Sequence, residues 1–184
     1  MKKLLLSALL FLASSALAQT QGGTLTAAWA QDPVGLDPHI TSAYSSFQIL
    51  ENVLDTLVTL DEEQNVVPSL AESWRVSEDG LTWTITLKEG ITFHDGTPFN
   101  AEAVKFSLDR FMQNGGKPSF LLADIVDTVE ATGDYEVTIA LQQPFAAFTS
   151  LLAFAGTCAV SPEAYALGEG EFTPNEFVGS GPYK

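Results

Sequence analysis

Cysteine is almost absent from this chain of 184 residues, in which Cys158 is the only one. A single cysteine excludes a disulfide within the chain. The apolar neighbours Ala159 and Val160 favour a strand at this position. We therefore expect Cys158 to be a small buried or half-buried residue rather than an exposed reactive thiol.

Basic residues are also few. Lysine and arginine together number 8, against 23 aspartates and glutamates, and the formal charge is −15. Such a chain repels nucleic acid and anionic lipid surfaces, so we expect no nucleic-acid partner. The charge favours solubility and, less strongly, cationic ligands.

Long hydrophobic runs are missing. The apolar run 4–12 is far shorter than the roughly 20 residues that a membrane span needs. Together with Lys2 and Lys3 before it and Ala16-Leu17-Ala18 after it, this run is typical of a signal peptide over residues 1–18. Gln19 follows the cleavage site where a lipid-anchored protein would carry cysteine, so we expect an unlipidated periplasmic protein. Removing two lysines leaves 8 − 2 = 6 basic residues, and 6 − 23 gives a charge of −17.

Catalytic and metal-binding motifs are missing too, since the chain contains no H-E-x-x-H, C-x-x-C or G-x-S-x-G. The pairs Asp37/His39 and His94/Asp95 leave a metal site or an acid–base pair open, but metal sites usually need three or four ligands. Both histidines lie in turn-rich loops, and we interpret their imidazoles as partners of backbone groups. We predict no enzyme activity, no cofactor and no metal site.

A glycine-rich segment, Gly179-Ser180-Gly181, lacks the lysine and the strand–helix order of a phosphate-binding loop. We predict instead a loop in which the glycines let two backbones pack closely.

The richest local pattern covers residues 73–112. Apolar and polar residues alternate over 73–77 and 81–88, and Asp79-Gly80 between them suits a tight turn, so a hairpin is predicted with Trp83 on its inner face. A turn at 94–98 follows. Asn100 is then placed as the N-cap of a helix over 101–112, which carries a Lys105–Asp109 pair four residues apart.

The rest of the chain alternates between short strands and helices. We expect strands at 24–30, 58–60, 66–67, 129–131, 135–141 and 157–160. The strands at 58–60 and 66–67 flank an acidic turn, those at 129–131 and 135–141 flank Gly133-Asp134, and each pair is predicted to form a hairpin. We expect an irregular loop at 31–41 and helices at 45–57, 120–123, 144–153 and from 161 onward, where Ser161-Pro162-Glu163 forms an N-cap and first turn.

Residues 83–110 read WTITLKEGITFHDGTPFNAEAVKFSLDR, and this order resembles the signature of the extracellular solute-binding proteins of family 5. These are the peptide and nickel receptors of ABC importers. The segments 36–39 (LDPH), 68–74 (PSLAESW) and 178–183 (VGSGPY) are similar to further parts of the family pattern.

The resemblance implies an α/β fold like that of type II periplasmic binding proteins, present here as an incomplete amino-terminal part. The expected divisions are a signal peptide (1–18), a first segment of lobe I (19–57), a hairpin-and-helix subdomain (58–176) and a return into lobe I (177–184).

The resemblance also implies where a solute would be held. In relatives, the segment at the exit of the first strand forms part of the wall around the ligand. The residues at this position here are Ala30, Gln31 and Asp32. Further matches are Thr41, Ser46, Phe120 and Cys158. At Cys158 the nickel receptors carry a basic residue, and this departure favours a peptide-like or other organic solute over a metal chelate. For Asp32, a structural role in which its carboxylate closes a turn is as well supported as a role in solute binding.

The function so implied is capture of di- or oligopeptides, or similar small organic solutes, in the periplasm and delivery to ABC permease subunits by a monomeric receptor. The alternatives are a sensory or chaperone-like binding module on the same fold, nickel-chelate binding, and a secreted hydrolase, for which no nucleophile motif is present.

Overall fold

The computed structural model describes residues 26–113, 118–166 and 178–183. The predicted signal peptide lies outside these residues. The chain divides into two compact units, Met1–Ala30 and Gln31–Lys184. Each is described by itself.

The predicted strand at 24–30 is wrong over the part that can be checked. Residues 26–30 are exposed and have no regular structure. An extended segment becomes a strand only when a neighbouring strand takes up its backbone hydrogen bonds, and none of the described strands pairs with it.

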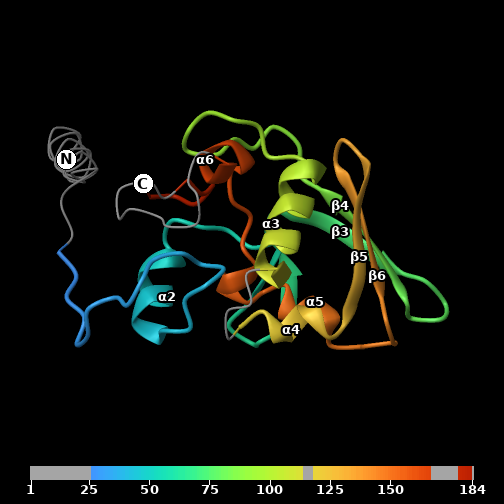
Figure 1. Ribbon diagram of the computed structural model, residues 1–184, viewed down its shortest axis with the longest axis horizontal. Helices are drawn as coiled ribbons and strands as arrows, with labels where there is room; N and C mark the ends of the chain where they lie inside the picture. Colours follow the sequence, from blue (N-terminus) through green and yellow to red (C-terminus); the bar gives the residue numbers. More distant parts are fainter. Residues whose placement is uncertain (1–25, 114–117, 167–177, 184) are drawn as a thin grey trace, which may run out of the picture. The chain divides into compact units, whose positions relative to one another are not determined.

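An antiparallel sheet of four strands dominates the second unit (Figure 1). Its order is β3-β4-β6-β5, formed by β3 (Ala71–Val76), β4 (Thr82–Leu87), β6 (Glu136–Leu141) and β5 (Val126–Gly133). The two hairpins predicted at 73–88 and 129–141 are confirmed, and Gly80 has the positive φ of +72° that the turn of the first needs. The hairpins join through β4 and β6, where Trp83 pairs with Ile139 and Ile85 with Val137.

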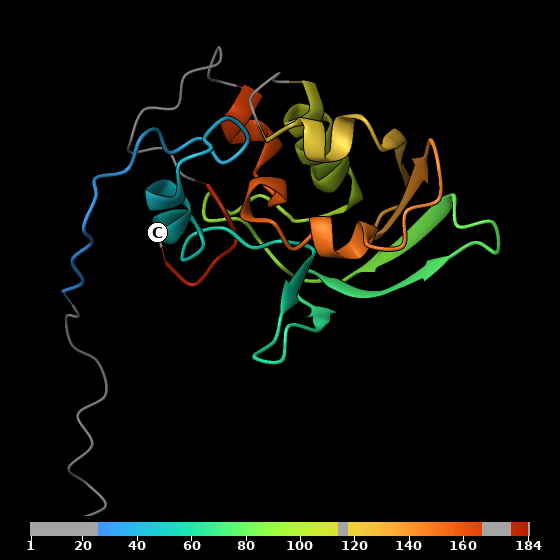
Figure 2. The ribbon, with the colours of Figure 1, turned by 90° about the horizontal axis from the view of Figure 1, so that it is seen from below.

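One face of this sheet forms the main core. Trp83, Ile85 and Leu87 alternate into it as predicted, and α3 (Ala101–Gln113) packs against it through Leu108 and Phe111. Figure 2 shows α3, α4 (Phe120–Ala123) and α5 (Phe148–Leu151) on the same side of the sheet. The side chain of Asn100 accepts a hydrogen bond from the amide of Ala103 at 3.0 Å, which confirms the N-cap. Lys105 and Asp109 pair at 3.0 Å.

The first helix is shorter than predicted. Helix α2 covers Tyr44–Leu50 instead of 45–57. Its continuation is replaced by turns because the carbonyls of Asn52 and Val53 accept hydrogen bonds from the amides of Tyr183 and Gly181. After it, β1 (Val58–Leu60) and β2 (Val66–Pro68) form the predicted hairpin across the acidic turn.

Two further predictions near the end of the chain need correction. Residues 157–160 are not a strand, since the 3₁₀ turn η2 (Ala155–Thr157) leads into irregular, buried chain. Here the amide of Ala159 bonds the carbonyl of Asp55 and that of Val160 bonds the hydroxyl of Ser107, so no ladder forms.

The helix predicted at 144–153 is reduced to α5, because the chain around it is held by bonds of the i to i+3 type rather than by a continuous helical ladder. Helix α6 (Pro162–Ala166) begins after Ser161 as predicted, with the Ser161 hydroxyl accepting from the amide of Ala164.

Candidate functional site

The irregular loop 31–43 carries three of the seven predicted site residues and is tied by hydrogen bonds within the loop and to α2. The Thr41 hydroxyl donates to the carbonyl of Val34, and the Ser46 hydroxyl accepts from the amide of Val34, both at 3.0 Å. The amides of Ile40 and Thr41 donate to the carbonyl of Asp37. The side chains of Thr41 and Ser46 are buried and shape the loop from within.

Beneath this loop lies a buried polar cluster centred on Arg110. The guanidinium donates to both carboxylate oxygens of Asp37, at 2.9 and 2.6 Å, and to Nδ1 of His39 at 2.9 Å. It also lies over the ring of Tyr165, 4.4 Å from the centroid. The four side chains come from the loop, from α3 and from α6.

The hydrogen bonds fix the tautomer of His39. Because Nδ1 accepts from Arg110, the ring proton lies on Nε2, which donates to the carbonyl of Cys158 at 3.2 Å. Burial, reinforced by the charge of Arg110, lowers the pKa of His39 from 6.5 to about 4. His39 is therefore neutral at neutral pH and acts as a connector between backbone and guanidinium.

The second histidine joins distant backbone segments. Nε2 of His94 donates to the carbonyl of Gly181 at 2.7 Å, and its amide donates to the carbonyl of Gly179. The interpretation of both imidazoles as backbone partners is thus confirmed. So is the close packing of the glycines, because a Cβ on Gly179 would lie 2.3 Å from the carbonyl oxygen of Val53.

Asp95, beside His94, takes part in turn geometry. It accepts hydrogen bonds from Thr97 and from the hydroxyl of Ser161. Burial alone would raise the pKa of Asp95, but these bonds together lower it. Across the described ranges, no three side chains of His, Cys, Asp or Glu gather closely enough to hold a metal ion.

The structure separates the predicted site residues. Gln31 and Asp32 are exposed, and the Asp32 carboxylate makes no hydrogen bond with the described residues, so a turn-closing role for it is not observed. Phe120 is 61% exposed on α4, which lies away from the loop 31–43 in Figures 1 and 2. Cys158 is fully buried, which raises the pKa of its thiol, and Ala30 is an exposed residue of the other unit. A contact between solute and any of the seven residues stays a prediction.

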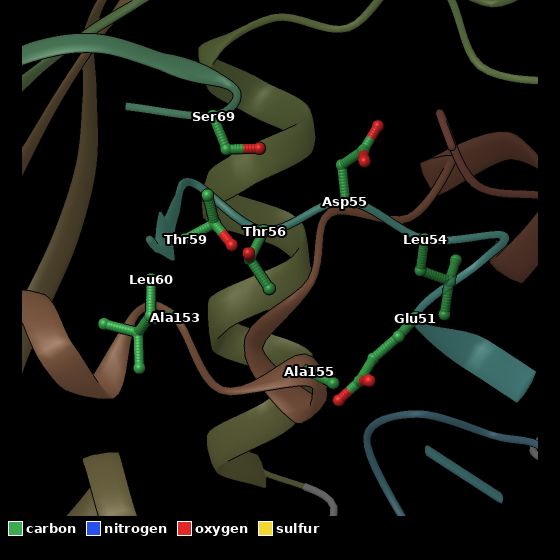
Figure 3. A pocket seen from close by; sticks show the side chains of 9 residues that line it. All are labelled: Glu51, Leu54, Asp55, Thr56, Thr59, Leu60, Ser69, Ala153 and Ala155. Atoms are coloured by element: carbon green, nitrogen blue, oxygen red, sulfur yellow. The ribbon is translucent and has the colours of Figure 1, made fainter. Parts of the chain in front are cut away.

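Two hollows lie near these elements. One, of about 280 Å³, follows the loop and is lined by Thr41, Asp37 and Ile40 among others. A larger one of about 440 Å³ is drawn in Figure 3. Its acidic members are Glu51 and Asp55, and none of the seven predicted residues lines it. The pKa of Glu51 is raised by partial burial.

Sequence reasoning did not single out Arg110. Leu108 and Phe111 lie on the buried face of α3, and Arg110 lies between them along the chain. A basic residue at the edge of a buried helix face signals a buried acidic partner, because burying an unpaired charge is costly. The partner, Asp37, lies 73 residues away in sequence.

Residues 65–184 match the family described as "Bacterial extracellular solute-binding proteins, family 5 Middle". The chain belongs to this family. Among curated relatives, the glutathione-binding protein GsiB of Escherichia coli O1:K1 is 43% identical over 154 residues, and that of strain K12 is 42% identical. Each match covers 81% of this chain and 29% of the relative, so the chain spans less than a third of these proteins.

Two solved structures of binding proteins are similar to this fold. The binding protein AgaA from A. tumefaciens R10, in complex with agropinic acid, matches with a TM-score of 0.76 and 28% identity, over 83% of this chain and 31% of that one. NikA from Brucella suis, in complex with Fe(III)-EDTA, matches with a TM-score of 0.72 and 29% identity, over 85% of this chain and 32% of that one. The predicted α/β fold of type II periplasmic binding proteins is confirmed for this part of it. None of the helices in the described residues has the length and apolar character of a membrane span.

Proposed function

We propose that this chain forms part of the solute-binding protein of an ABC importer that captures peptides in the periplasm, with glutathione as the first solute to test. The observation that supports this is the 43% identity to a glutathione-binding protein over 154 residues. The wall would be supplied by the exposed residues Gln31 and Asp32, at the start of a loop whose later residues Asp37 and His39 are tied to the core.

The mechanism of such a protein is enclosure. As two lobes close, the solute loses its water and forms hydrogen bonds and ion pairs with groups of both lobes. The permease then recognises the closed conformation. The loop 31–43 would contribute one wall. Its rigidity matters, because a wall that is already ordered costs less to complete on binding.

A graft tests this proposal. The matched region of the Escherichia coli K12 protein would be replaced by the corresponding residues of this chain, and glutathione binding measured by isothermal titration calorimetry beside the parent. We expect affinity within about tenfold of the parent. If the graft folds cooperatively but the titration with glutathione gives no heat of binding, glutathione is not the solute.

Nickel chelates are the second candidate, supported by the similarity, at 26% identity, to NikZ from Campylobacter jejuni in complex with Ni(L-His). The same graft distinguishes them. A heat of binding on titration with nickel–histidine complexes, and none on titration with glutathione, would favour nickel chelates.

A further inference from the structure

One charged side chain, Arg110, makes three of the hydrogen bonds that attach the loop 31–43 to the core. Arg110 projects from the last turn of α3 and reaches Asp37 with two hydrogen bonds and His39 with a third. The side chains of Arg110 and Asp37 are only 13% and 11% exposed. This is a bidentate, largely desolvated ion pair, the geometry in which an arginine fork specifies position most strongly.

The connection continues from Asp37 to the outer part of the loop. Its carboxylate accepts from the amide of His39, and its carbonyl accepts from the amides of Ile40 and Thr41. The hydroxyl of Thr41 then holds the carbonyl of Val34. Val34 lies two residues after Asp32, so the position of the exposed carboxylate follows from the ion pair through a short chain of contacts.

His39 adds a second attachment to the same cluster. Its Nε2 donates to the carbonyl of Cys158, and its ring packs edge to face on the ring of Phe111, with the ring centroids 6.1 Å apart. The cluster therefore connects the loop to α3, to the chain at residue 158 and, through the ring of Tyr165, to α6.

We propose that Arg110 is the positioning residue of the solute-binding wall: its clamp on Asp37 and His39 holds the loop 31–43 in the shape that presents Gln31 and Asp32 to a solute. The inference rests on the proposed function in assigning a solute to this wall. The clamp itself is a property of the chain and is tested without any solute.

A double variant separates positioning from general stability. Changing Arg110 alone would leave the buried Asp37 charge unpaired and weaken the whole fold. Asp37→Leu combined with Arg110→Met removes both charges and keeps apolar volume, an exchange that is often neutral for stability. Lys105→Met, which removes a cation from the same helix, serves as the control.

Hydrogen exchange on the complete chain gives the first readout. In the double variant, the amides of Ile40 and Thr41, whose acceptor is the backbone carbonyl of Asp37, should exchange at least about tenfold faster, while those of Leu87 and Leu141 in the sheet keep their rates. Arg110→Lys, which keeps the charge without the fork, should give an intermediate loop rate. Lys105→Met should leave the loop unchanged. An unchanged loop in the double variant, or equal acceleration of loop and sheet, would overturn the proposal.

Calorimetry on the graft gives the second readout. The double variant should lower glutathione affinity at least about tenfold with its unfolding midpoint preserved. Unchanged affinity despite a loosened loop would overturn the link between clamp and wall. If the unaltered graft does not bind glutathione, the proposed solute fails, and hydrogen exchange still decides the role of Arg110.

Discussion

Asp32 is the residue on which the predicted wall depends most. Its carboxylate is exposed and bonds none of the described residues, although it lies close in sequence to the anchored residue Val34. Aspartates in loops commonly close turns with their own side chains. A carboxylate on an ordered loop that does not do so is available to an ammonium or amide group of a solute.

Replacing Asp32 by Asn in the graft should therefore weaken glutathione binding about tenfold, the cost of a charge-assisted hydrogen bond, with little change in stability. Calorimetry and a thermal melt measure the two effects. Glu62→Gln, an exposed acid in the β1–β2 turn, removes the same charge elsewhere and should leave affinity unchanged. Equal affinity for the Asp32 variant and this control would remove Asp32 from the wall.

His39 makes the stability of the fold depend on pH. Its pKa is lowered from 6.5 to about 4 on folding, so between these values the unfolded chain binds a proton that the folded chain does not. The stability contributed by neutral His39 is fully present above pH 6.5 and is lost as the pH falls toward 4.

Between about pH 7 and pH 5 this amounts to about 2 kcal/mol of unfolding free energy. His39→Gln keeps a donor for the carbonyl of Cys158 but does not titrate, and urea unfolding at both pH values should show a smaller loss for it. A variant that loses as much stability as the original would show that another group is responsible.

At the scale of elements, the two faces of β4 should respond differently to truncation. Trp83 is 7% exposed and packs on Phe148 with ring centroids 5.5 Å apart. Trp83→Ala should cost about 3–5 kcal/mol from lost burial and a residual cavity. Thr84 points to the opposite face, and Thr84→Ala should cost less than about 1 kcal/mol. Similar losses in a denaturant titration would mean that the faces are assigned wrongly.

The segment 178–183 makes a second testable contact. A Cβ on Gly179 would lie 2.3 Å from a backbone oxygen of Val53, which no side-chain rotation relieves. Gly179→Ala should therefore destabilise the chain by about 1–3 kcal/mol. Gly133→Ala is the matched control, because its Cβ would make an ordinary 3.5 Å contact with Glu136. A neutral Gly179→Ala would contradict the close approach.

The sequence predicted the elements whose cause is local. The hairpins, the Asn100 cap and the glycine contact depend on alternation, turn residues and the missing Cβ, all visible within a few positions. The ends of α2 and the irregular chain at 157–160 depend on partners far away, Gly181 for Val53 and Ser107 for Val160. For the same reason the sequence marked Asp37 and His39 as unusual but did not find Arg110.

At the scale of the whole molecule, the chain matches 29% of the length of the glutathione-binding relatives. Under the two-lobe mechanism proposed above, the exposed predicted wall residues Gln31 and Asp32 would offer contact from one side only. One wall supplies only part of the contact area and cannot enclose the solute. Most of the affinity should therefore depend on a second lobe.

Calorimetry with glutathione on the graft and on residues 19–184 alone tests the dependence on a second lobe. We expect 1:1 binding by the graft, at close to the parent's affinity, and binding by residues 19–184 that is weaker by at least about a hundredfold. A folded graft that binds no glutathione, or residues 19–184 binding as tightly as the graft, would contradict it.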